Sequence, residues 1–116
     1  MSRVISPDEF TAVLRERLAT TEILGVVRAV TGPGRSGAIA AAHASHITGL
    51  PFLPFGARGP SPVLIVDTAQ KSGRTMRAAI RRYERMGMPA GGVVCFCEPP
   101  RVRFWYEAGA QVGGAA

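Results

Sequence analysis

Apolar positions along the chain recur with two different spacings. After Ser6 they return every three or four residues, which predicts an amphipathic helix from about residue 7 to 20, and Glu9 completes a capping box with Ser6. An Ala-rich stretch over 36–48 and an Arg-rich stretch over 74–86 predict two more helices. Polar residues therefore follow the outer sides of three predicted helices.

Short continuous apolar runs lie between these helices and predict buried strands. The predicted strands cover residues 23–30, 52–55, 63–66, 92–98 and 102–106. Strands that alternate with helices indicate an α/β fold, with a parallel sheet covered by helices on both faces. We expect one domain over 1–108 and a flexible tail over 109–116.

Composition narrows the choice of ligand and of compartment. The chain has 116 residues and a net charge of +6, so it should attract phosphorylated ligands or a polyanion. Thirteen of its fourteen basic residues are Arg, and the exception is Lys71. No run is apolar enough to span a membrane and the first residues do not form a signal peptide, so we expect a cytoplasmic protein.

The thiols and imidazoles do not suggest a metal site. Cys95 and Cys97 lack a second ligand pair and are interpreted as reduced sheet residues. His43 and His46 lack a third ligand, so we interpret them as a packed or solvated pair. We predict no metal ligand among the protein's side chains.

Two strand-to-helix turns carry the candidate chemistry, because ligands of such folds gather at the carboxyl ends of parallel strands. The second turn, DTAQKSGRT, opens a helix whose free N–H groups and positive dipole end suit a phosphate. Asp67 would repel phosphate, so it should accept hydrogen bonds from sugar hydroxyls or contact Mg²⁺ through water. The predicted phosphate-binding residues are Lys71, Ser72, Gly73, Arg74 and Thr75.

The first turn, TGPGRSG, has the same Gly-rich character. It either binds an anion or simply brings a helix close to the sheet. The alternative for the second turn is an inherited turn that binds nothing.

Four aliphatics, an acid, a short loop and a helix opened by Ser-Gly-Arg-Thr resemble the phosphoribosyl diphosphate signature of the type I phosphoribosyltransferases. The resemblance covers most of the chain, since TGPGRSGAIAAAHASHITGLP is similar to the family's pyrophosphate loop and the helix after it. It implies an α/β fold with a Rossmann-like parallel sheet, in which the second turn holds the ribose 5-phosphate and Asp67 faces the ribose. It also implies that Mg²⁺ takes part. The resemblance places the pyrophosphate on Thr31, Gly32, Gly34, Arg35 and Ser36. It also implies a homodimer and places the aromatic residues of 104–106 near an acceptor base.

The chain departs from the family's pattern at three places. Thr68 stands where the family has a second acid, and Lys71 stands where purine-using members have an acid. The family's long flexible loop is reduced to about ten residues over 52–62. We also expect no separate hood domain.

Three functions fit this sequence. The first is transfer of a phosphoribosyl group to a nucleobase, in which Asp67 would be the catalytic residue. The second is a regulatory protein that binds phosphoribosyl diphosphate or a nucleotide without catalysis. The third is a scaffold whose Arg-rich helix contacts a protein or nucleic acid, although such a face is more often only solvated.

Overall fold

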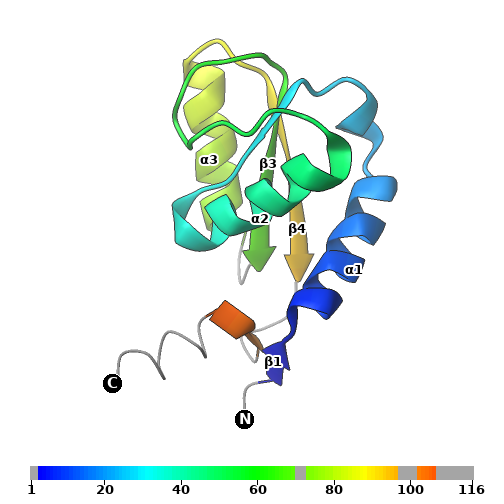
Figure 1. Ribbon diagram of the computed structural model, residues 1–116. Helices are drawn as coiled ribbons and strands as arrows, with labels where there is room; N and C mark the ends of the chain where they lie inside the picture. The colour runs from blue at the N-terminus through cyan, green and yellow to red at the C-terminus, as the bar shows by residue number, and fades with distance from the viewer. Residues whose placement is uncertain (1–2, 70–72, 97–101, 107–116) are drawn as a thin grey trace.

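Three parallel strands form the central sheet of the computed structural model, which describes residues 3–69, 73–96 and 102–106. They are β2 (Ala29–Thr31), β3 (Val63–Ala69) and β4 (Ala90–Phe96), in the order β2-β3-β4. Ala29 pairs with Val63 in the first ladder, and Val63 pairs with Ala90 in the second. All three strands therefore start at one end of the sheet and finish at the other (Figure 1).

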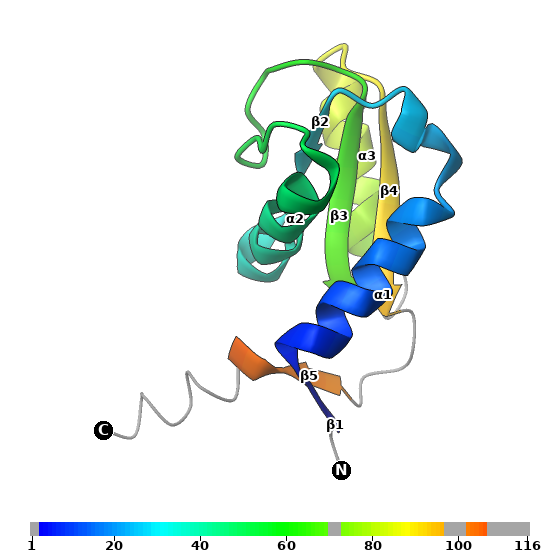
Figure 2. The ribbon, with the colours of Figure 1, turned by 45° about the vertical axis from the view of Figure 1, so that its right-hand side comes forward.

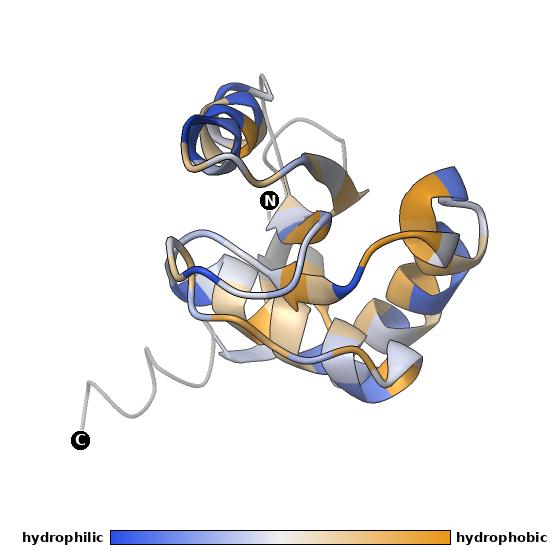
Figure 3. Cartoon of the chain, turned by 90° about the horizontal axis from the view of Figure 1, so that it is seen from above, coloured by the Kyte–Doolittle hydropathy of each residue, from blue (hydrophilic) through white to orange (hydrophobic). Residues whose placement is uncertain are grey.

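Helices cover both faces of this sheet, as predicted. α1 (Pro7–Ala19) and α2 (Gly34–Thr48) pack on the face that carries Leu64 and Val66. α3 (Arg74–Arg85) packs on the opposite face, so that β3 lies between two layers of helix (Figure 2). Viewed from above, the central strands are mainly hydrophobic and the helices carry most of the hydrophilic colour (Figure 3).

The ends of the three helices follow from local sequence. The Ser6 hydroxyl accepts a hydrogen bond from the Glu9 N–H at 3.1 Å, as a capping Ser should. Gly49 ends α2 in a left-handed conformation with φ 76°, which glycine adopts without a Cβ clash. The predicted helices are confirmed with shifts of one or two residues.

A second, two-stranded sheet lies beyond the carboxyl ends of the central strands (Figure 1). Its strands are β1 (Arg3–Ile5) and β5 (Val102–Phe104), which pair in parallel. Trp105 packs with Phe10 of α1 and His43 of α2, at centroid distances of 5.7 and 6.0 Å. This aromatic contact joins the end of the described chain to its first helix.

Two strand predictions were largely wrong. Of residues 23–30 only Ala29–Thr31 is a strand, because Glu22–Gly25 forms a 3-10 turn (η1) that packs Ile23 and Leu24 against the core. Phe52 makes a single bridge to Val30, and Pro54, which has no N–H to donate, follows two residues later.

The other boundaries moved for similar local reasons. The last strand stops at Phe104, and residues 105 and 106 are helical. β3 continues beyond the predicted residue 66 to Ala69, because its polar end still pairs with β4. β1 was not predicted, since three residues are too short to show a period. Cys97 and the proposed 109–116 tail lie outside the described residues.

Cys95 is a buried free thiol, as predicted, and His43 packs edge-on against Phe10 at 5.3 Å. Among the described helices, none combines the length and the apolar character that crossing a bilayer requires.

Candidate functional site

The two Gly-containing turns lie next to each other at the carboxyl end of the sheet. β2 leads into the first turn and β3 into the second, and these strands are parallel neighbours. Gly34 and Gly73 therefore stand at the same end of the sheet. This is the arrangement that the sequence predicted for a phosphate-binding edge.

The buried half of the first turn is fixed by close backbone packing. A Cβ on Gly32 would collide with the Gly37 carbonyl and lie 2.5 Å from the Val66 carbonyl oxygen. Gly32 thus lets the start of α2 approach β3, which is the structural alternative considered for this turn. Thr31 is fully buried, and its hydroxyl has no hydrogen-bond partner.

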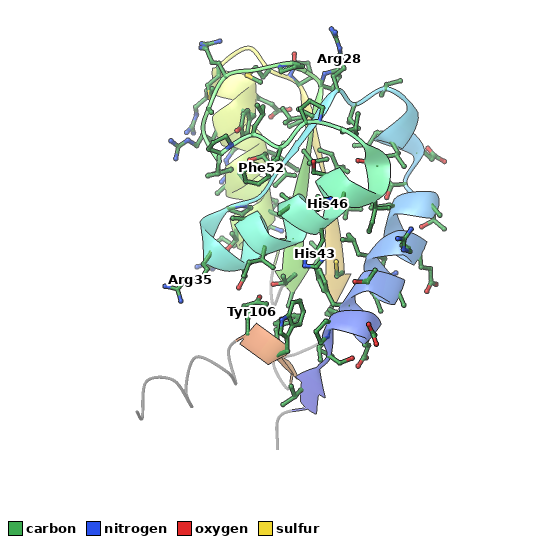
Figure 4. All side chains as sticks on the ribbon, viewed as in Figure 1. Arg28, Arg35, His43, His46, Phe52 and Tyr106 are labelled. Carbon is green, nitrogen blue, oxygen red and sulfur yellow. The ribbon has the colours of Figure 1, made fainter. Side chains whose placement is uncertain are left out.

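The outer half of the first turn is open. Gly34 is exposed, has φ 68°, and would have no atom within 4 Å of an added Cβ. Arg35 is exposed and its side chain points away from the body of the molecule (Figure 4). The Ser36 hydroxyl accepts a hydrogen bond from the Tyr106 hydroxyl at 3.0 Å. Of the predicted pyrophosphate residues, only Gly34 and Arg35 are therefore openly presented to solvent.

The second turn ends in a glycine that begins α3. Gly73 has φ 76° at the N-cap and offers no side chain to cap the first turn of the helix. Its carbonyl accepts the Arg77 N–H at 3.0 Å, so the helix is formed from its first residue. Arg74 and Thr75 are exposed at this end, whereas Lys71 and Ser72 lie outside the described residues.

Asp67 lies on β3 just before the second turn. Side chains alternate along a strand, so Asp67 shares the α3 face of the sheet with Ile65, which packs in the α3 core. Thr31 is aligned with Ile65 on the neighbouring strand, so its unpartnered hydroxyl belongs to the same face.

Burial shapes the chemistry of the Asp67 carboxylate. Desolvation raises its pKa, and a hydrogen bond from the Thr68 N–H at 2.8 Å partly opposes that rise. The predicted contact of Asp67 with the ribose stays a prediction, and Ser72, which we expect to bind the neighbouring phosphate, lies outside the described residues.

Several contacts, among them the buried hydroxyl of Tyr83, hold the shortened loop over 52–62 against α3. Tyr83 accepts a hydrogen bond from the Gly56 N–H at 2.8 Å and donates to the Ala57 carbonyl at 3.2 Å. The Phe55 ring meets the Tyr83 ring edge-on at 5.7 Å, and Arg58 donates to the Met86 carbonyl at 3.0 Å. These contacts hold the loop against the helix that carries the second turn.

Solved structures with the same architecture include phosphoribosyltransferases. The xanthine-guanine-hypoxanthine phosphoribosyltransferase of Helicobacter pylori superposes with a TM-score of 0.79 at 14% identity, over 100% of this chain and 99% of that one. The fold is that of the type I phosphoribosyltransferases.

Two further structures share this fold. The purine phosphoribosyltransferase of Pyrococcus horikoshii gives a TM-score of 0.69 at 17% identity, over 90% of this chain and 93% of that one. A Neisseria gonorrhoeae protein solved with bound ppGpp gives 0.66 at 14% identity, over 99% and 98% of the two chains. No protein-family model and no curated protein matches the sequence.

The phosphoribosyltransferase fold implies Mg²⁺, and the donor set can be compared with that ion. The described residues contain no group of three or more acidic, His or Cys side chains placed to hold a metal. Thr68, at the position of the family's second acid, is buried and neutral. Asp67 alone fits an ion that is held mostly by the phosphates of a substrate and touched by the protein through water.

Sequence reasoning missed the wall that Phe55 and Tyr83 form between the shortened loop and α3. In the sequence, Tyr83 is one position of the predicted helix over 74–86 and Phe55 one position of the predicted strand over 52–55. Their joint position depends on how the loop folds back onto α3, which no local spacing encodes. The signal that remained was a Tyr on an otherwise Arg-rich helix, facing a loop with two Gly and three Pro.

Proposed function

We propose that the chain binds a phosphorylated ribose, with phosphoribosyl diphosphate as its main ligand, at the carboxyl ends of β2 and β3. The observation that carries this proposal is the second turn, where Gly73 opens α3 with φ 76° beside the half-buried Asp67. Backbone N–H groups at a helix start bind phosphate without help from particular side chains. The shared fold of the phosphoribosyltransferases supports the same assignment.

Each residue of the site has a proposed role. The ribose 5-phosphate sits on the turn from Lys71 to Thr75, with Arg74 adding charge and Thr75 a hydroxyl. Asp67 accepts hydrogen bonds from the ribose hydroxyls, and its buried position makes those bonds stronger. The pyrophosphate lies toward the first turn, where Gly34 is exposed, and Mg²⁺ accompanies the diphosphate.

We propose that the chain binds its ligand at this site but transfers little or none of the phosphoribosyl group to a base. The loop over 52–62 is tied to Tyr83 and is therefore poorly suited to close over a reacting sugar and exclude water. Thr68 also removes one carboxylate from the edge of the sheet. The alternative is an active phosphoribosyltransferase, which the activities in the names of the structural neighbours favour.

Titration calorimetry with phosphoribosyl diphosphate, with and without Mg²⁺, tests the binding claim. We expect saturable binding that weakens as salt is raised, because part of the attraction is charge. Ribose 5-phosphate and ppGpp, the ligand of the Neisseria neighbour, are titrated alongside. Absence of binding to all three ligands would overturn the proposed function.

A pyrophosphate-release assay with xanthine, guanine and hypoxanthine distinguishes binding from transfer. We expect little release above the rate without a base. Rapid release with one of these bases would instead establish the alternative, and the binding site would then be an active site.

A further inference from the structure

Arginine is concentrated on one helix of this chain. α3 has twelve residues, of which five are Arg and one, Glu84, is acidic. Its buried side is apolar and consists of Met76, Ala79 and Tyr83. At about 3.6 residues per turn, the five Arg fall within an arc of about 140° on the opposite side of the helix. All five are exposed, and they are Arg74, Arg77, Arg81, Arg82 and Arg85.

The Arg-rich composition of the whole chain does not explain this surface. α1 is also a surface helix, but it carries three acidic residues beside its two Arg, so its charges nearly cancel. Of the six acidic residues in the described ranges, four lie on α1 and η1, which pack on the side of the sheet away from α3 (Figure 2). These four are Asp8, Glu9, Glu16 and Glu22. Positive charge is therefore collected on the α3 side of the molecule.

The arrangement is unfavourable for the helix itself. Arg77, Arg81 and Arg85 are spaced four residues apart, so each has a like charge one turn away. Arg74 and Arg77 also stand in the first turn, where the helix dipole favours negative charge and no acidic residue is present. Within the described part of the chain, no ion pair to Arg81 or Arg85 offsets the repulsion. A polyanion bound along the helix would remove it.

The shortened loop adds a cation to the end of this surface. Arg58 donates a hydrogen bond to the Met86 carbonyl at 3.0 Å, which places a further guanidinium at the last turn of α3. Arg58 is exposed, and it comes from a part of the chain distant from α3 in sequence. The basic surface is thus built from two segments and not from one helix alone.

A cleft of about 420 Å³ runs along α3 beside these arginines. Phe55, Ala78 and Arg82 are among its lining residues, and the Arg82 guanidinium lies over the Phe55 ring, 5.2 Å from the ring centre. Nucleobases are flat and stack on guanidinium groups and aromatic rings, and a cleft of this size accepts a small ring system. An acidic protein segment would offer carboxylates to the arginines but no flat ring to the cleft. The cleft therefore favours nucleic acid as the partner.

We propose that the exposed face of α3 binds single-stranded nucleic acid. The phosphates of the strand contact Arg77, Arg81 and Arg85, which follow one another at about 6 Å along the helix axis, and Arg58 adds a further contact. One base of the strand enters the cleft and stacks on Arg82. A duplex keeps its bases paired and cannot fill the cleft, so a single strand should bind more tightly than a duplex.

Fluorescence anisotropy with labelled oligonucleotides tests this surface in the full chain. The probes are oligothymidylate, oligouridylate, a thymidylate–adenylate duplex of the same length, and polyglutamate as an acidic protein mimic. Arg81→Gln and Arg85→Gln are made singly and together. Arg15→Gln is the matched control, because it removes the same charge from an exposed residue of α1, on the other side of the sheet. The melting temperature reports folding, and it should not fall in Arg81→Gln, which loses a like charge on either side.

The salt dependence of binding counts the phosphate contacts. The logarithm of the affinity for a single strand should fall with the logarithm of the salt concentration by about 0.7 for each phosphate that is neutralised. Each single α3 variant should therefore lower the slope by about 0.7 and weaken binding several-fold at low salt. The double variant should lose about 1.4 of the slope and about tenfold or more in affinity, whereas Arg15→Gln should change the slope by less than about 0.3.

The same variants leave the proposed phosphate site untouched. Arg81 stands about 10 Å from Arg74 along the helix axis, so the affinity for ribose 5-phosphate should stay within about twofold in every variant. Failure of ribose 5-phosphate to bind, together with a normal single-strand titration, would overturn the proposed function and leave the α3 surface standing.

Several outcomes overturn the nucleic-acid surface. Equal losses in Arg81→Gln and Arg15→Gln would show that only net charge matters, and an unchanged salt slope in the double variant would show that these arginines touch no phosphate. Polyglutamate bound as tightly as the single strands would identify an acidic protein as the partner instead. Duplex bound as tightly as single strand would overturn the stacking of a base in the cleft. Failure of the unaltered protein to bind either single strand would overturn the whole proposal.

Discussion

The two strand-to-helix turns look alike in sequence but use their glycines differently. In the first turn, Gly32 is buried and packs against Gly37, so its missing side chain serves helix–sheet packing. In the second turn, Gly73 has a positive φ and stands at the open N-terminus of α3. Glycines of similar Gly-rich turns can therefore be packed against the backbone or open at a helix start, and only the surroundings of each glycine distinguish the two.

The largest effect should come from the packed glycine. Gly32→Ala would place a methyl group into the Gly37 backbone and 2.5 Å from the Val66 carbonyl oxygen, where no flexible side chain can move away. We expect a loss on the order of 3 kcal/mol in the free energy of unfolding, measured by denaturant titration. The control is Gly25→Ala, which meets no atom within 4 Å and should stay within about 0.5 kcal/mol of the unaltered protein. Equal stability of the two variants would contradict the packing role.

The second prediction separates backbone strain from ligand binding. Gly73 and Gly87 both have φ 76° and lie at opposite ends of α3. Valine at either position should cost about 1–2 kcal/mol or more, because a β-branched residue is strained in the left-handed region. Only Gly73→Val should also abolish binding of ribose 5-phosphate, measured by calorimetry under conditions where both variants are folded. Loss of binding in Gly87→Val as well would show that the effect is general destabilisation.

The sequence predicted the parts of the fold that depend on local pattern. The Ser6 cap, the Ala-rich α2 and the amphipathic α3 follow from residue spacing, and the parallel order of β2 and β3 follows from the alternation of elements. The extended run over 23–30 failed because its apolar residues reach the core from the 3-10 turn at Glu22–Gly25. Burial alone does not specify whether such a run is extended.

The candidate site, like the fold, was predictable from the sequence only in part. The position of both turns could be predicted, since parallel strands bring their carboxyl ends together. The different roles of Gly32 and Gly73 could not, because the first depends on a contact with the distant Val66 carbonyl. The wall formed by Phe55 and Tyr83 was missed for the same reason, as it joins residues 28 positions apart.

The third prediction concerns the wall that Phe55 and Tyr83 form between the shortened loop and α3. Tyr83→Phe keeps the ring contact with Phe55 but leaves the Gly56 N–H without its acceptor. We expect a loss of about 1 kcal/mol in stability, the typical net contribution of a hydrogen bond, since the Gly56 amide is only partly buried. Hydrogen exchange at the Gly56 amide should speed up, while exchange at Gly37, in the first turn, should not change beyond the global loss. Unchanged exchange at Gly56 would show that the loop is held by its other contacts.

The smallest effect should come from Asp67, and it should have the opposite sign. Burial raises the pKa of this carboxyl above its ordinary value of 3.8, so the folded state disfavours the charged form. Asp67→Asn keeps an oxygen that can accept the Thr68 N–H and removes the buried charge. The variant should therefore be slightly more stable than the unaltered protein at neutral pH, by denaturant titration, although it should bind a ribose more weakly.

The pH dependence checks the origin of this gain. Below the ordinary pKa of Asp, the carboxyl of the unaltered protein is protonated in both the folded and unfolded states, so the gain from Asp67→Asn should vanish. The gain should appear as the pH rises through the raised pKa of the folded state and then stay constant.

Asp8→Asn is the control. Asp8 is exposed in the first turn of α1, where a negative charge stabilises the helix, so this variant should lose a few tenths of a kcal/mol at neutral pH. A loss of stability in Asp67→Asn at neutral pH would mean that the carboxylate has a stabilising partner in the folded protein. A gain without a loss of ribose binding would instead separate Asp67 from the ligand, and the buried charge would then have no functional explanation.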